Sequence, residues 1–265
     1  MNTNISKKLK TKKNYFELFQ DIDISEGDIV YVASDILKLS IFYKQNKILF
    51  DPNIFIDTLI KIVGDKGILL FPTFNWDFCK GKIFDYKKTP SNCGSLSNIA
   101  LQRSDFKRTK HPIHSFAVFG KHKNYLCNLE NKSSWGEDSP FKFLYKNSKN
   151  LFIGIDYKNG FTMDHYFEQL TNVKYRYHKD FKSTYIDEKK IESKKIFSMY
   201  VRDTQVVDTT KIDPSLDKIL LENNALKINF INDIQFSLIY LHKAGEILIN
   251  DLNSDCKYIY PIKYK

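Results

Sequence analysis

The chain has 265 residues, of which 42% are hydrophobic and 15% aromatic, and it carries a net charge of +10. A chain of this length buries about three-quarters of its unfolded surface, so its core needs no disulfide or metal, and the apolar content excludes an intrinsically disordered protein. No window approaches 18 consecutive apolar residues, which excludes a membrane-spanning helix.

Residues 1–13 are polar and lysine-rich, without the apolar stretch of a secretory signal or the arginines of a transit peptide. We expect them to form a flexible, basic N-terminus of a cytoplasmic protein. The four cysteines lie far apart and lack C-x-x-C spacing, which indicates reduced thiols rather than a disulfide framework or a zinc knuckle. They are Cys79, Cys93, Cys127 and Cys256.

The positive charge comes mainly from lysine, since only four of the 41 basic residues are arginine. Nucleic-acid-binding proteins depend on arginine for bidentate contacts, and no nucleic-acid-binding motif is present, so we expect no nucleic-acid partner. The charge favours a field that attracts phosphate-bearing small molecules. A lysine- and asparagine-rich composition also arises from an A/T-rich genome, which is the alternative explanation.

Short apolar runs alternate with helical periodicity along the chain. Alternating strands and helices indicate an α/β fold, which we expect to be a layered α/β/α arrangement with a mixed central sheet. We predict a single domain over residues 1–265, with 180–210 as an insertion or hairpin. In chain order we predict a strand at 28–32, a helix at 52–63, a strand at 67–72, a helix at 95–103, a strand at 116–120, a helix at 139–145, a strand at 150–154, a helix at 163–170, an extended segment at 195–207 and helices near 214–223 and 233–250.

The most informative segment for chemistry is 154–168, where a buried strand ends, a loop follows and a helix begins. His165 and Glu168 are three residues apart, so on a helix they share a face and can form a hydrogen bond. A carboxylate beside an imidazole fixes its tautomer, which is how a general base is built. Thr162 occupies the expected N-cap, which brings its hydroxyl near the same site. The alternative is a capped helix with an incidental His–Glu pair.

A second candidate is the polar, basic segment Arg108–Ser115, which precedes the predicted strand at 116–120. Lysine and hydroxyl groups ahead of a buried strand suit the binding of phosphate or of pantetheine amides. The alternative is a turn stabilised by its His–Pro sequence. Thr73 and Phe74 are a third candidate, because a hydroxyl beside aromatic rings at a strand end suits a ligand cleft. Ser34 has the equivalent position after the first strand.

Other reaction classes lack their sequence motifs. His111, His114, His165 and Glu168 are residue types that bind zinc, but the H-E-x-x-H signature is absent and we expect no metal. The chain also has no G-x-S-x-G elbow, no P-loop and no G-x-G-x-x-G loop. These absences disfavour a serine hydrolase, a nucleoside triphosphatase and a nicotinamide-dependent enzyme.

In their order along residues 24–252, the segments resemble the aminoglycoside 3-N-acetyltransferase family, also called the antibiotic N-acetyltransferase family. No stretch is specific alone, but the ordered set is. The stretches are Gly27–Val32, Val63–Phe74, Gly94–Ser97, Arg108–Ser115, Gly136–Pro140, Thr162–Glu168 and Tyr175–Arg176.

The resemblance implies acetyl-CoA-dependent N-acylation of an amino sugar. Its T-x-x-H-x-x-E motif implies that Thr162, His165 and Glu168 are catalytic. One departure concerns Ala33-Ser34-Asp35-Ile36, where many members carry His-Ser-Ser-Leu, and this leaves the local contacts with CoA or the acceptor open. The family's R-[ST]-x-H-P-x-x-S segment and P-T-F turn are both present, and the first serine of His-Ser-Ser-Leu is kept as Ser34. The resemblance therefore implies cofactor-binding roles for Ser34, Thr73, Phe74, Arg108, Thr109, His111 and Ser115.

These assignments lead to direct transfer in a ternary complex, in which His165 takes a proton as the amine attacks the thioester of acetyl-CoA or another acyl-CoA. Because the chain is basic, we expect an acceptor with a diphosphate, such as a nucleotide-linked amino sugar for surface glycan synthesis. The first alternative is a polycationic aminoglycoside, which a locally acidic cleft would favour. The second is a catalytically inactive sugar- or nucleotide-binding protein. The sequence does not fix the oligomeric state, and a homodimer is one option.

Overall fold

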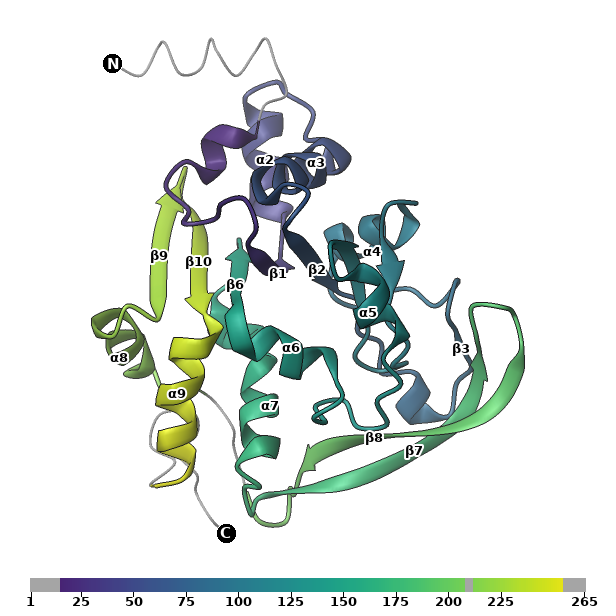
Figure 1. Ribbon diagram of the computed structural model, residues 1–265. Coiled ribbons are helices and arrows are strands. Elements are labelled where there is room, and N and C mark those ends of the chain that lie inside the picture. The colour runs from purple at the N-terminus through teal and green to yellow at the C-terminus, as the bar shows by residue number, and fades with distance from the viewer. Residues whose placement is uncertain (1–14, 208–211, 255–265) are drawn as a thin grey trace.

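The computed structural model describes residues 15–207 and 212–254, so the basic segment 1–13 lies outside the described residues (Figure 1). A main sheet has the strand order β4-β5-β2-β1-β6-β10-β9, and a smaller sheet has the order β3-β7-β8. The strands are β1 (Ile29–Ser34), β2 (Ile68–Pro72), β3 (Phe84–Asp85), β4 (Lys107–Arg108), β5 (Phe116–Gly120), β6 (Ser148–Ile153), β7 (Arg176–Ile186), β8 (Glu192–Arg202), β9 (Leu226–Ile231) and β10 (Ile234–Tyr240).

The helices lie between these strands and at the end of the described chain. The α-helices are α2 (Leu37–Gln45), α3 (Pro52–Val63), α4 (Ser95–Gln102), α5 (Lys123–Asn128), α6 (Pro140–Asn147), α7 (Met163–Leu170), α8 (Leu216–Glu222) and α9 (Leu241–Leu252). The 3₁₀ helices are η1 (Phe16–Phe19), η2 (Phe78–Lys80) and η3 (Tyr157–Asn159). Helix α3 begins where expected because Pro52 is its first residue and the Asp51 side chain accepts hydrogen bonds from two backbone N–H groups of its first turn.

Three parallel strands form the centre of the main sheet. Strand β1 pairs in parallel with β2 and with β6, while antiparallel pairing adds β5 and β4 on one side and β10 and β9 on the other. Central parallel strands are buried on both faces, which explains the uninterrupted apolar run Ile68–Pro72. The predicted α/β fold with a mixed central sheet is confirmed.

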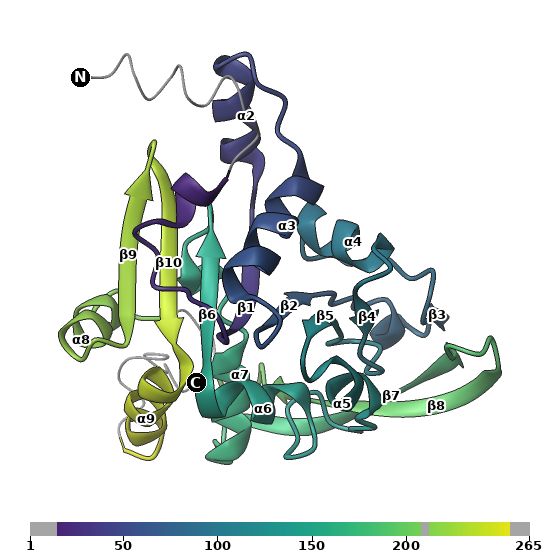
Figure 2. The ribbon, with the colours of Figure 1, turned by 45° about the horizontal axis from the view of Figure 1, so that its top comes forward.

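Alternation of side chains along the central strands builds a core on each face of this sheet. In β1, Val30 and Val32 pack with residues of α3 and α4, whereas Tyr31 and Ala33 pack with residues of α6, α7 and α9. Helices α3 and α4 accordingly lie together and apart from α6, α7 and α9 (Figure 2). Helix α7, which carries His165, is thereby fixed against the sheet.

The smaller sheet consists mainly of a long hairpin. Strands β7 and β8 pair antiparallel along their whole length, and β3 pairs in parallel with the far end of β7. The hairpin starts beyond α7 and runs along the outside of the molecule to β3 (Figures 1 and 2). The segment 180–210, expected as an insertion or hairpin, overlaps this pair, and its residues 208–211 lie outside the described residues.

The helix expected over 233–250 is wrong in its first half. Residues Ile234–Tyr240 form β10, and α9 begins only at Leu241. Asn232 and Asp233 have positive φ angles of 51° and 60°, which suit a two-residue hairpin turn, and this turn joins β10 to the unexpected strand β9. The pairing of β10 with β9 and β6 overrides its weak helical pattern.

Two smaller expectations concern membranes and cysteines. Across residues 15–207 and 212–254, no helix is long and apolar enough to cross a membrane. Cys79, Cys93 and Cys127 are free thiols, as their spacing indicated, and Cys256 lies outside the described residues.

Candidate active site

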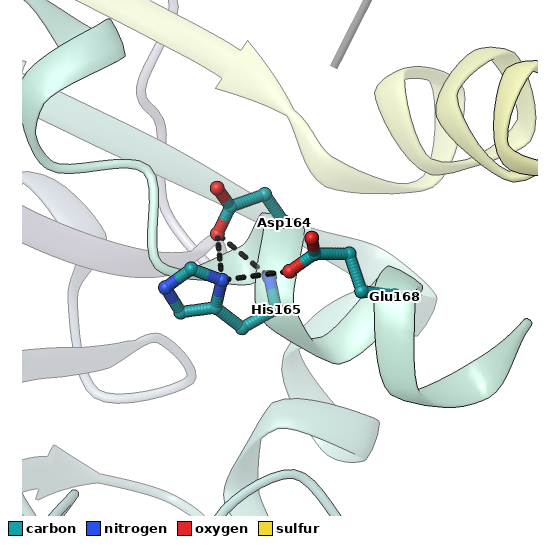
Figure 3. A group of neighbouring side chains, drawn as sticks. All are labelled: Asp164, His165 and Glu168. Atoms are coloured by element: carbon teal, nitrogen blue, oxygen red, sulfur yellow. Dashed lines mark hydrogen bonds and ion pairs between the residues drawn. The ribbon is translucent and has the colours of Figure 1, made fainter. Parts of the chain in front are cut away.

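The site begins with His165 and Glu168 on α7. Helical spacing puts them on one face, and Nδ1 of His165 lies 2.8 Å from Oε2 of Glu168 (Figure 3). Glu168 is fully buried, whereas 29% of the His165 side chain is exposed. The second ring nitrogen, Nε2, points away from the neighbouring carboxylates. A buried carboxylate thus holds one nitrogen of an accessible imidazole.

Both oxygens of the Glu168 carboxylate have partners. The Tyr175 hydroxyl donates to Oε1 over 2.9 Å, and Nε of Arg176 forms an ion pair with Oε2 at 2.8 Å. Burial alone would raise the pKa of Glu168, but the hydrogen bond and charge of His165 and the charge of Arg176 outweigh it and hold this pKa below its ordinary value. Glu168 is therefore ionised at neutral pH.

A second carboxylate, Asp164, completes the group, and sequence reasoning missed it. Its Oδ1 accepts a hydrogen bond from the backbone N–H of His165 over 2.6 Å and lies 3.2 Å from Nδ1. Asp164, His165 and Glu168 place three possible metal-ligand atoms within 4.8 Å of one another. Arg176 already supplies a fixed positive charge at Glu168 Oε2, so a metal ion there would meet electrostatic repulsion. The group suits proton transfer better than metal binding.

A cavity of about 750 Å³ lies where β1, β2 and β6 end. Ligands of open α/β sheets bind at the carboxyl ends of parallel strands, and this volume is in the range of small-molecule sites. Three predicted site residues line it, namely Ser34, Phe74 and Thr162. The complete lining is Tyr31, Ala33, Ser34, Asp35, Ile36, Leu37, Ser40, Pro72, Phe74, Trp76, Asn92, Cys93, Gly94, Ser95, Ile155, Asn159, Gly160 and Thr162.

Thr162 connects this cavity to α7, but it does not cap the helix as expected. Its backbone is already helical, with φ −64° and ψ −14°, and its side chain makes no capping hydrogen bond. Its N–H donates to the Gly160 carbonyl over 2.9 Å, so the chain turns before the helix without a side-chain cap. The Thr162 side chain instead lies next to Tyr31, another residue of the cavity lining.

A chain of aromatic rings provides the second connection between the cavity and His165. The centroid of the Phe74 ring lies 4.7 Å from that of His114, which lies 4.8 Å from that of Trp135. Trp135 in turn packs edge-on at 5.1 Å from His165. His165 is not part of the cavity lining, so these rings and α7 fix its position relative to the cavity. Sequence reasoning did not identify Trp135.

Apart from the half-buried Lys110, the Arg108–Ser115 segment is buried against the end of β2, and it does not line the cavity. Arg108 donates from Nε to Oγ of Ser115 over 2.9 Å and from Nη2 to the Thr73 carbonyl over 3.1 Å. Ser115 Oγ donates to the same carbonyl over 3.0 Å and lies 2.8 Å from Oγ1 of Thr73. These contacts hold the turn that directs Phe74 into the cavity, so we expect Arg108, Thr73 and Ser115 to support the site from behind.

Thr109 and His111 are also buried and bonded to backbone groups. Thr109 Oγ1 accepts a hydrogen bond from the first N–H of β5. Nδ1 of His111 accepts from the N–H groups of Ile113 and His114, and its Nε2 donates to the Lys132 carbonyl over 3.3 Å. Burial lowers the pKa of His111 to about 3, so the ring is neutral. Neither residue lines the cavity, and their contact with CoA stays a prediction.

Comparison with solved structures defines the class of fold, which is that of the aminoglycoside acetyltransferases. Sisomicin-bound AAC-VIa matches with a TM-score of 0.74 and 18% identity, over 91% of this chain and 96% of that chain. AAC-IIIb in a binary complex with CoASH also has a TM-score of 0.74, with 15% identity over 92% of this chain and 95% of that chain.

The sequence then fixes the family. The family model for aminoglycoside 3-N-acetyltransferase matches residues 42–244, and the chain belongs to this family. A curated relative is the SPbeta prophage-derived aminoglycoside N(3')-acetyltransferase-like protein YokD of Bacillus subtilis (strain 168), which is 29% identical over 126 residues. That match covers 38% of this chain and spans about half of the relative, 46% of its length. The resemblance inferred from the ordered motifs is confirmed.

Proposed function

We propose that this protein transfers an acetyl group from acetyl-CoA to an amine of an amino-sugar acceptor, with His165 as the general base. The observation that carries the proposal is the accessible imidazole held at Nδ1 by an ionised, fully buried Glu168. Family membership supplies the reaction class. Complexes of two relatives with CoASH and with sisomicin supply the two kinds of ligand.

In this mechanism His165 handles the proton of the acceptor. Glu168 holds Nδ1, so Nε2 takes a proton as the amine attacks, a contribution of about 10²–10⁴-fold. Asp164 and Glu168 stabilise the imidazolium that forms, because both carboxylates face Nδ1. The imidazolium then returns the proton to the departing thiolate. Acetyl-CoA supplies the activated acyl group, and we expect no covalent enzyme intermediate.

The cavity fits the pantetheine arm of CoA in its chemistry. Amides of that arm need hydrogen-bond partners, and Ser34, Asn92 and Ser95 provide hydroxyl and amide groups beside the apolar surface of Phe74. Among the described residues, no lysine or arginine lines the cavity, so we expect the phosphates of CoA to lie outside it. In this proposal Ser34 and Phe74 contact CoA directly.

The acceptor we propose is a polycationic aminoglycoside rather than a nucleotide-linked amino sugar. The sequence-based preference for a diphosphate rested on the net charge of +10, but the lysines that produce this charge do not line the cavity. Asp35 is the charged member of the described lining. Beside His165, Asp164 and Glu168 carry two negative charges, of which Arg176 offsets one. This local balance favours an ammonium group over a diphosphate, and the relatives' names point to the same acceptor.

An assay of thiol release from acetyl-CoA tests the function. We expect release with a gentamicin-type aminoglycoside, weak release with a nucleotide-linked amino sugar and none without an acceptor. Thiol release only with the nucleotide-linked amino sugar would contradict the aminoglycoside proposal and support the acceptor expected from the net charge of the chain. Binding of either sugar with no thiol release would indicate the inactive sugar-binding alternative. Expression in a susceptible host should raise resistance to the aminoglycoside.

Asp35→Asn should weaken the binding of a cationic acceptor by about fivefold, because a partly exposed ion pair is worth up to about 1 kcal/mol. Asparagine can keep the hydrogen bond that Asp35 Oδ1 accepts from the N–H of Leu37, so the start of α2 should persist. The measurement is KM for the aminoglycoside at low salt, with the exposed Asp65→Asn as control. An equal increase in KM for a neutral amino sugar would contradict an electrostatic role for Asp35.

A further inference from the structure

Two partners compete for Nδ1 of His165. Oε2 of Glu168 lies 2.8 Å from this nitrogen, and Nη2 of Arg176 lies 3.1 Å from it. An ionised carboxylate can only accept a hydrogen bond, and a guanidinium can only donate one. Nδ1 therefore donates to Glu168 if it is protonated or accepts from Arg176 if it is not. The outcome decides which ring nitrogen carries the lone pair.

The surrounding charges favour a protonated Nδ1. Oδ1 of Asp164 is a second carboxylate oxygen at 3.2 Å, and an unprotonated Nδ1 would face repulsion from both carboxylates. Nε of Arg176 pairs with Oε2 of Glu168 at 2.8 Å and Nη1 donates to the Tyr200 carbonyl over 3.1 Å, so one guanidinium nitrogen, Nη2, faces Nδ1 against two carboxylate oxygens. Nε2 then carries the lone pair, on the side of the ring that points away from both carboxylates (Figure 3).

We infer that Arg176 is a positioning residue that fixes this tautomer by keeping Glu168 ionised, an inference that rests on the proposed role of His165. Only 7% of the Arg176 side chain is exposed, and a guanidinium remains charged whatever the state of the neighbouring ring. Without it, the fully buried Glu168 would have a charged partner in His165 only while the imidazole is protonated. Beside a neutral His165, the unpaired buried carboxylate would take up a proton and donate it to Nδ1, which would leave the ring proton on Nε2.

The titratable groups around this ring come from several elements. Burial lowers the pKa of His114 well below its ordinary value, and the charges of His111 and His165 act in the same direction, so His114 is neutral. Arg176 therefore supplies a permanent positive charge that offsets one of the two carboxylate charges next to the ring. The groups that face the site are Asp164 and Glu168 from α7, Tyr175 and Arg176 at the start of β7, Tyr200 from β8 and His114 from the loop before β5.

The tautomer can be measured without any turnover by ¹⁵N NMR of the imidazole side chains near pH 8. In the wild-type protein we expect His165 to carry its proton on Nδ1. In Arg176→Gln we expect a mixture of tautomers or a proton on Nε2, whereas Arg176→Lys should keep the wild-type form because it retains the charge. The wild-type tautomer in Arg176→Gln would overturn the inference, even if the protein proves to have no transferase activity.

A double-mutant cycle tests whether Arg176 acts through Glu168. When a metal-binding imidazole loses the side chain that holds its other nitrogen, metal affinity or activity falls about 10–100-fold. We expect a similar fall in kcat for Arg176→Gln, with little change in KM for acetyl-CoA. In a Glu168→Gln background the same change should have almost no further effect, because the carboxylate it serves is gone. If the reductions of kcat caused by Arg176→Gln and Glu168→Gln simply multiplied in the double variant, Arg176 would not act through Glu168.

The control for lost stability is Arg103→Gln, which removes ion pairs at 2.7 Å to Asp57 and Asp105 outside the His165 group. We expect wild-type kcat for this variant. If Arg176→Gln does not fold, Arg176→Lys carries the test. It should keep the wild-type tautomer and at least about a tenth of wild-type kcat, and a tautomer change with the charge present would overturn the inference.

Discussion

Replacing His165 with alanine should lower kcat for acetyl transfer by about 10²–10⁴-fold, because a positioned general base contributes that much to such a reaction. The affinity for acetyl-CoA should change little, since His165 does not line the cavity and its ring is held from α7. Steady-state kinetics with both substrates saturating measure the loss of kcat, and calorimetry with CoA measures binding. The combination separates a catalytic loss from a loss of the site.

His242→Ala is the matched control for this variant. His242 is exposed on α9 and lies 3.6 Å from Glu246 one turn away, so it also forms a helical His–Glu pair, but one outside the site. We expect its kinetics to match wild type. A His165→Ala enzyme that kept more than about a tenth of the wild-type rate would show that another group takes the proton.

The comparison of His165 with His242 also explains why part of the site could be predicted from sequence. The contact between His165 and Glu168 is local, so helical spacing alone predicts it. Spacing cannot separate it from the His242–Glu246 pair, because both satisfy the same rule. The difference lies in burial and in the charge of Arg176, which depend on how α7 packs against the hairpin.

The partners of His165 that the sequence analysis gave no role come from separate elements or lack a distinct signal. Arg176 begins β7 and Trp135 lies in the loop before α6, and only the tertiary fold brings them to His165. Asp164 directly precedes His165, and its position in the first turn of a helix was the available signal. The cofactor roles of Arg108 and His111 follow from the family resemblance and stay predictions. In the structure both side chains bond to buried backbone carbonyls, a contact that the motif does not reveal.

The central strands, which are buried on both faces of the sheet, were predicted to within a few residues, because continuous apolar runs such as Ile68–Pro72 have few alternatives. Ile234–Tyr240 mixes apolar and polar residues with only a weak helical pattern, so its sequence alone does not distinguish a helix from a strand. The turn at Asn232 and Asp233 was the missed signal, since both residue types tolerate positive φ better than others. Pairing with β6 then decides the structure.

Acidification should destabilise this protein well above the range in which carboxylates titrate. Burial lowers the pKa of His111 to about 3 and that of His114 well below its ordinary value, so the folded protein binds fewer protons than the unfolded chain. This stabilisation is complete above the pKa of histidine in the unfolded chain, about 6.5, and it is lost as the pH falls below that value. Below about pH 6.5, each of the two histidines should lower the free energy of unfolding by about 1.4 kcal/mol per pH unit. The pair together should lower it by about 4 kcal/mol at pH 5.

Urea unfolding at several values between pH 7.5 and 5 measures this slope. His111→Asn should be less stable at pH 7.5, because asparagine replaces the Nδ1 acceptor but loses the bond to the Lys132 carbonyl. Its slope should nevertheless be about half that of wild type, because one of two buried groups no longer titrates. His242→Asn should keep the full slope, since that side chain is exposed. If His111→Asn kept the wild-type slope of unfolding free energy against pH, the acid sensitivity would arise from other groups. The slope, rather than the stability at a single pH, therefore identifies the buried imidazoles as the source of the acid sensitivity.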